Sequence, residues 1–117
     1  LAQPAVAQPA PTGAPDPHAG HAMPMPAAAN EARSTIDFRA ANDRMHRDMG
    51  VDYTGNADRD FLAAMIPHHQ GAIDMAEVEL RHGKDPKVRK LAQNIIRAQR
   101  KEIAQMREWL RQTERRR

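Results

Sequence analysis

Methionine and histidine are the residues of this 117-residue chain that are best suited to chemistry. The sequence contains seven Met and six His but no Cys, which excludes thiolate metal sites and disulfides. The thioether of Met is a soft, uncharged ligand, and a cluster of Met with one or two His suits Cu(I) far better than Zn(II), iron or Mg²⁺. The composition therefore predicts that any metal bound is copper, as Cu(I).

The candidate ligands recur at helical spacing. Met45 and Met49 are four residues apart, and His46 lies three before Met49, so these three can converge on one patch of a helix. The adjacent pair His68-His69 follows Met65 on a mostly apolar pattern. The complete predicted metal-ligand set is Met45, His46, Met49, Met65, His68, His69, Met75 and Met106.

An ordinary core role competes with this interpretation, because Met at helical spacing commonly fills gaps between helices. For Met75 or Met106 taken alone, core packing is the favoured interpretation. Met75 is also about 10 Å along a helix axis from His68, which predicts that Met75 lies at a different level of the bundle. The tract His18, His21, Met23 and Met25 favours metal, since it lies in a segment with no folding reason to hold such residues.

The chain divides into a tail and one helical domain. Residues 1–30 contain seven of the nine prolines among Ala and Gly, which predicts a disordered tail with a Met/His tract. Residues 31–117 are rich in Ala, Leu, Met, Arg and Glu and poor in aromatic residues, which favours helices over sheets. Since no run of about 20 apolar residues occurs, no segment is expected to span a bilayer.

Start and stop signals predict three helices in the second segment. The first begins in a capping-box-like sequence at Ser34 and ends near Gly50. The second is capped by Asn56 or Asp58, is kinked at Pro67, and stops at Gly83. The third has Asp85 as N-cap and Pro86 in its first turn, and continues almost to the end of the chain.

Three such helices predict an all-α antiparallel bundle. Only the tail or a second copy of the chain could add a fourth helix, so a homodimer is one of the expected arrangements. Counting from the turn near Lys84 places Met65 level with about Ile103 and close to Met106. Counting from a loop around Thr54 places Met45 level with about Ala63.

Charge and the chain start bear on location. The chain has a net charge of +3 and ends in three arginines, Arg115–Arg117. Because no aromatic residues are interleaved with these arginines, they indicate a solvated helix end rather than a nucleic-acid site. Leu1-Ala2-Gln3 followed by Pro-Ala repeats is typical of what remains after a processed signal peptide. We therefore expect a periplasmic or secreted protein.

The central segment resembles a known family. Met65-Ile66-Pro67-His68-His69-Gln70, with the flanking pattern over residues 42–112, resembles a bacterial domain of unknown function. That family is similar to ferritin-like bundles and includes CopM-type periplasmic proteins that bind copper and are associated with copper resistance. The resemblance implies that the eight candidate ligands belong to the family's signature, and leaves open which of them touch metal.

Two alternatives to a copper protein remain. Glu79-x-x-His82 has the spacing of a di-iron ligand pair, with Asp43-x-x-His46 as its only partial partner. A metal-free structural or partner-binding bundle is the second alternative. No nucleophile with a base, phosphate loop or paired-carboxylate site occurs, so no enzyme activity is predicted. The favoured function is copper storage, buffering, transfer or resistance, with copper ions and a copper donor or acceptor protein as partners.

Overall fold

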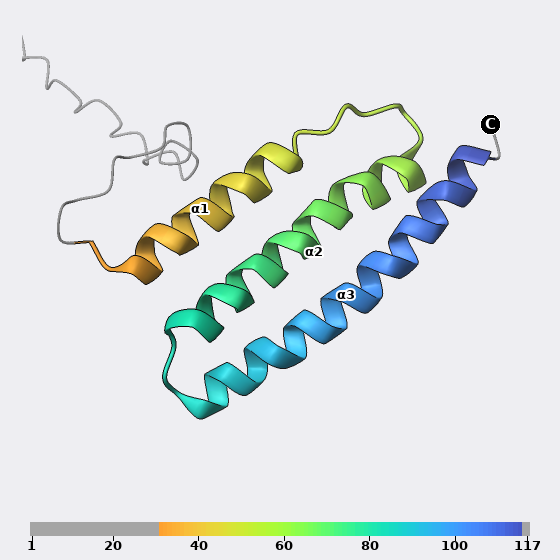
Figure 1. The fold of residues 1–117 in the computed structure, drawn as a ribbon. Helices are drawn as coiled ribbons and strands as arrows, with labels where there is room; N and C mark the ends of the chain where they lie inside the picture. Colours follow the sequence, from red (N-terminus) through yellow and green to blue (C-terminus); the bar gives the residue numbers. More distant parts are fainter. Residues whose placement is uncertain (1–30, 116–117) are drawn as a thin grey trace, which may run out of the picture.

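Three antiparallel helices make up the described part of the chain, residues 31–115 (Figure 1). In this computed structural model they are α1 (Arg33–Asp48), α2 (Ala57–His82) and α3 (Pro86–Arg115). The prediction of an all-α domain of three long helices is confirmed. The predicted tail of residues 1–30 lies outside the described residues, as does its Met/His tract.

The sequence signals for α2 and α3 act as predicted. The Asn56 side chain accepts a hydrogen bond from the backbone N–H of Arg59, 3.1 Å away, and Gly83 follows the last residue of α2. The Asp85 carboxylate accepts from the N–H of Lys87 at 2.9 Å, and α3 begins at Pro86. α2 continues through Pro67 as one helix.

The predicted cap of α1 is wrong. This helix begins at Arg33, after Ala32, and no side chain caps it. Asp37, the last residue of the predicted capping box, instead accepts a hydrogen bond from the His82 ring of α2, with 2.7 Å between Oδ2 and Nε2. A tertiary contact has therefore taken the carboxylate that a local motif would have used.

The helices form a single layer with α2 in the middle. α1 packs against α2 and α2 against α3, whereas no Cα atom of α1 lies within 8 Å of one of α3 among the described residues. Gly71 of α2 faces Met45 of α1, and Ile73 faces the cluster shared with α3. At about 100° per residue these two positions point in nearly opposite directions. Residues 31–115 therefore leave two broad faces of α2 uncovered.

The core is thin and lies along the two seams of this layer. Between α2 and α3 the buried cluster comprises Leu62, Ile73, Ile103 and Met106, with Met65 packed against it. This contact confirms that Met65 is level with Ile103 and Met106. Between α1 and α2 the buried residues are small, and Val78 is the largest side chain that is fully buried in the described structure. α1 is thus attached by close approach rather than by large apolar groups.

The predicted register of α1 is wrong. Met45 lies over Gly71, eight residues beyond the predicted Ala63, and Asp37 is level with His82. The reason is that the connection over residues 49–56 does not turn tightly at Thr54. It runs on past the end of α1 to reach the start of α2, which extends well beyond α1 (Figure 1).

Gly71 allows the close approach of α1, which generates a stability prediction. A Cβ at Gly71 would lie 2.5 Å from Sδ and 3.0 Å from Cβ of Met45. We expect Gly71→Ala to lower the free energy of unfolding by about 1 kcal/mol, because overpacking outweighs the gain in helix propensity. In a Met45→Ala background the same change should destabilise less, because Sδ and Cγ are gone and only the Cβ contact at 3.0 Å remains. Urea unfolding measures both; destabilisation of equal size in the two backgrounds would contradict this packing.

Candidate metal centre

His69 is held by hydrogen bonds at both ring nitrogens. Nδ1 lies 2.9 Å from the carbonyl oxygen of Met65, one turn earlier in α2. Nε2 lies 2.6 Å from Oε2 of Glu102 in α3. A carbonyl and a carboxylate are both acceptors, so a ring that carries a proton on each nitrogen satisfies both. His69 therefore joins α2 to α3, and metal binding at Nε2 would require displacement of Glu102.

His68 has the opposite character. Its side chain is exposed, and its ring centroid lies 6.0 Å from that of His69 in an edge-on arrangement. Within residues 31–115 no hydrogen bond or ion pair engages the His68 ring. Met65 precedes it by three residues, on the same face of α2. This imidazole is free to bind a metal beside a thioether.

α1 brings two further thioethers towards the middle of α2. The sulfur of Met45 lies against Gly71, one turn from His68. Met49 is half-buried one turn later, at the C-terminal end of α1, and His46 is exposed between them. The sequence-predicted cluster on α1 is thus adjacent to the His68-His69 segment, although by a register different from the predicted one.

The remaining two methionines separate from this region. Met106 is 7% exposed and packs with Leu62 and Ile73 in the core between α2 and α3. Met75 is 45% exposed and lines a groove with Phe38 and Leu91, nearer the turn between α2 and α3. Met75 therefore lies at a different level along α2 from His68, as its spacing predicted.

The donor set of the central region consists of thioethers with imidazole. Within residues 31–115 no three His, Asp or Glu side chains gather closely enough to hold a metal ion. Two thioethers lie near this level of α2: that of Met65, three residues before His68, and that of Met45, whose sulfur lies against Gly71, three residues after His68. Both are soft and neutral. This chemistry fits Cu(I).

The two halves of the di-iron alternative lie far apart. His82 pairs with Asp37, which also lies 3.6 Å from Arg81, and the Glu79 carboxylate lies over Gly83. His46 sits beside Met45, level with Gly71, which is about 16 Å along α2 from His82. The described helices therefore do not bring Glu79-x-x-His82 and Asp43-x-x-His46 together.

Two features that position α1 and α2 were not predicted from the sequence: the hydrogen bonds of Asp60 to the connection before α2, and the close approach of α1 at Gly71. The Asp60 carboxylate accepts hydrogen bonds from the backbone N–H and hydroxyl of Thr54 and from the N–H of Gly55, over 2.9–3.1 Å. These bonds, with that from the Thr54 N–H first, hold the pKa of Asp60 below its usual value and tie the connection to the first turn of α2. An isolated glycine within the helical pattern was the available signal for the close approach at Gly71.

An all-α protein with a Met/His cluster on its central helix is the class that this fold and site define. The chain belongs to the family described as "Domain of unknown function (DUF305)", which it matches over residues 3–110. The predicted membership of a domain-of-unknown-function family is confirmed.

One relative is the Uncharacterized protein L153 of Acanthamoeba polyphaga mimivirus. It is 43% identical over 49 residues, which make up 42% of this chain and 32% of the relative. The matched segment thus spans about a third of that protein's length. None of the helices in residues 31–115 combines the length and apolar character needed to cross a membrane.

The hydrogen bond between Asp37 and His82 gives a pH prediction. The hydrogen bond from His82 lowers the pKa of Asp37 from its ordinary 3.8, and the Arg81 charge adds to this. The ionised carboxylate therefore stabilises the fold at pH values above 3.8, and this contribution is lost as the pH falls through the lowered pKa. Asp37→Asn should lower Tm at pH 7, and the difference from wild type should shrink below pH 4 in thermal scans. Asp48→Asn, an exposed acid at the end of α1, is the control; a Tm loss for Asp37→Asn that is independent of pH would contradict this account.

Proposed function

We propose that this protein binds Cu(I) at the middle of α2 and serves in copper storage, buffering, transfer or resistance. The observation that best supports the proposal is the exposed, unengaged imidazole of His68 one turn from the thioether of Met65. Soft sulfur with one imidazole is a ligand set that selects Cu(I) over harder metals. Met45 of α1, whose sulfur lies against Gly71 one turn after His68, is the proposed third ligand.

The two adjacent histidines have different proposed roles. His68 supplies a ligand, whereas His69 acts as a positioning residue, because Glu102 and the Met65 carbonyl already occupy its ring nitrogens. The hydrogen bond to the Met65 backbone fixes the turn that holds the Met65 sulfur. A site with an exposed ligand favours metal exchange, which suits buffering or transfer to another protein better than permanent storage.

The proposed setting is the periplasm or the exterior of the cell, where copper-resistance proteins of the CopM type act. The tract His18, His21, Met23 and Met25 is proposed to capture copper as a second, weaker site. Met49, His46, Met75 and Met106 remain further candidates, with Met106 the least accessible of them. The protein's partners would be copper ions and a copper donor or acceptor protein.

A Cu(I) competition titration against bicinchoninate, under reducing conditions and with the full chain, tests this proposal. We expect at least micromolar affinity, and Met65→Leu and His68→Ala should each weaken it by about tenfold or more, equivalent to about 1.4 kcal/mol. Met65→Leu keeps the volume while it removes the sulfur. Gln70→Ala is the matched control, because Gln70 is exposed on the opposite face of the same helix.

Two results would contradict the proposal. One is full competition by the indicator with no copper retained by the protein. The other is unchanged affinity in Met65→Leu and His68→Ala when replacement of the four tail residues abolishes binding, which would place the site in residues 1–30. Stoichiometric iron in the purified protein would instead favour the di-iron alternative.

A further inference from the structure

The large apolar side chains that are exposed on this protein gather around two hollows of its surface. Apart from Tyr53 in the connection before α2, every large hydrophobic residue exposed in the described structure lines one of two hollows. Phe38, Met75, Val88 and Leu91 line a groove of about 360 Å³ near the turn between α2 and α3. Phe61 and Trp109 line the hollow at the other end of the same two helices.

Both hollows open on the same face of the layer. Leu91 and Trp109 are separated by five full turns at 3.6 residues per turn, so they point in the same direction from α3. Phe61, Met65, His68, Ala72 and Met75 follow one stripe of α2 at steps of four and three. These stripes define what we call the apolar face.

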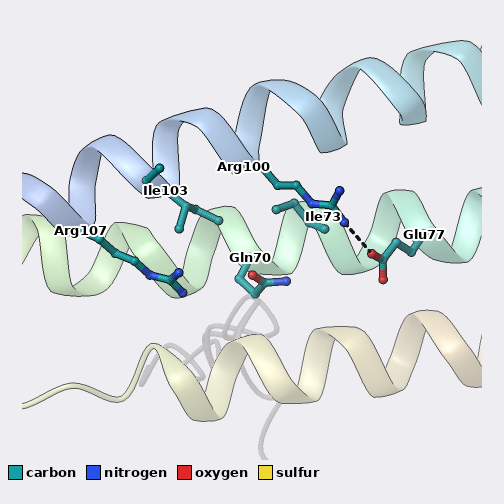
Figure 2. A pocket seen from close by; sticks show the side chains of 7 residues that line it. Gln70, Ile73, Glu77, Arg100, Ile103 and Arg107 are labelled. Atoms are coloured by element: carbon teal, nitrogen blue, oxygen red, sulfur yellow. Dashed lines mark ion pairs between the residues drawn. The ribbon is translucent and has the colours of Figure 1, made fainter.

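The opposite face has the composition expected of a surface in water. It is lined by Gln70, Glu77, Arg100 and Arg107, and Arg100 lies 3.7 Å from Glu77 (Figure 2). Among the described residues that line the two hollows of the apolar face, the charged ones are Asp58 and Glu79, with no Lys or Arg. Glu102 lies between the hollows on the stripe of Leu91 and Trp109, where it accepts a hydrogen bond from His69. Aromatic and Met side chains with little Lys around them are typical of the centre of a protein interface.

We propose that a second copy of this chain covers the apolar face, with its helices running in the opposite direction about a two-fold axis. The exposed aromatic pair of each copy, Phe61 and Trp109, would then pack against the groove of the other, whose lining includes the small residues Ala72, Ala76 and Ala92. The contact is self-complementary, as a two-fold interface requires. The three-helix layers of the two copies would then pack face to face and share one apolar core.

The register of the helices agrees with this arrangement. A two-fold axis at His68 exchanges the level of Phe61 with that of Met75, and an axis at Arg100 exchanges Trp109 with Leu91. Because His69 and Glu102 are in contact across the seam between antiparallel helices, His68 and Arg100 lie within about one turn, about 4.5 Å, of the same level. A single axis therefore brings each aromatic residue to within about one turn of the level of the groove.

The size of the face clears the lower limit for a specific dimer interface. From Phe61 to Glu79 it is about 27 Å long and, for two helices, about 20 Å wide, which gives roughly 550 Å² per copy. Two copies would bury roughly 1,100 Å², above the roughly 1,000 Å² that a specific interface needs. The thin core of one layer gives a physical reason for this association, since small domains often depend on oligomerisation for stability.

The axis passes beside the proposed copper ligands. Met65 and His68 of the two copies would face each other near it, so the metal site would draw on both chains. This consequence alone rests on the proposed function; the interface itself does not require copper. Dimer formation is therefore tested on metal-free protein, and its outcome is independent of the copper titration.

Sedimentation velocity of the metal-free full chain tests the interface. We expect a mass of twice 13.1 kDa for the wild type. Leu91→Glu, on the apolar face, should shift the species to the monomer mass, whereas Ala104→Glu, an exposed position of α3 on the opposite face, should leave the dimer intact. A monomeric wild type at 100 µM, or dimer loss in Ala104→Glu alone, would overturn the proposal.

Single cysteines test the direction of the helices without any loss of apolar contact, because the natural chain has none. Ala98 is exposed on the stripe of Leu91 and Trp109, close to the proposed axis. Ala98→Cys should oxidise to a covalent dimer on non-reducing gels at least tenfold faster than the control Ala104→Cys. In the proposed dimer Val88→Cys should not cross-link, because Val88 lies far from the axis. Cross-linking of Val88→Cys as fast as that of Ala98→Cys would indicate parallel chains, and equal rates for Ala98→Cys and Ala104→Cys would indicate no specific interface; either result would overturn the proposal.

Discussion

Burial of α2 along two opposite stripes is the constraint on which the rest of the structure depends. Gly71 lets α1 approach on one side, and Leu62 and Ile73 bury against α3 on the other. A helix buried on two opposite sides keeps two faces open. The layer, the exposure of His68 and the presence of an apolar face beside a polar one all follow from this arrangement.

The same constraint separates the two adjacent histidines. One position along an α-helix turns the side chain by about 100°, so His69 points into the seam with α3 while His68 points out of the layer. The first is engaged at both nitrogens and fixes the turn that contains Met65. The second stays accessible. Of the two adjacent histidines, His69 thus has a structural role and His68 the proposed role of metal ligand.

Much of the fold could be predicted from local signals. Asn56, Gly83 and Asp85 set helix ends through caps that need no tertiary context, and the short turn after Gly83 fixed the level of Met65 against Ile103. The register of α1 could not be predicted, because an eight-residue connection does not reveal whether it turns or runs extended. For the same reason Asp37 was assigned to a cap, and the contacts of Met45 with Gly71 were missed. The residue types of the candidate site could be predicted, but the engagement of His69 by Glu102 depends on side-chain geometry across a seam.

The central claim is that methionine sulfur and imidazole bind Cu(I) together at the middle of α2. Since the chain contains no cysteine, any sulfur bound to copper must come from methionine. X-ray absorption fine structure of the full chain loaded with one equivalent of Cu(I) measures this directly. The account predicts sulfur and imidazole nitrogen in the same first coordination shell, with the sulfur contribution reduced in Met65→Leu. A first shell of nitrogen and oxygen alone would contradict it.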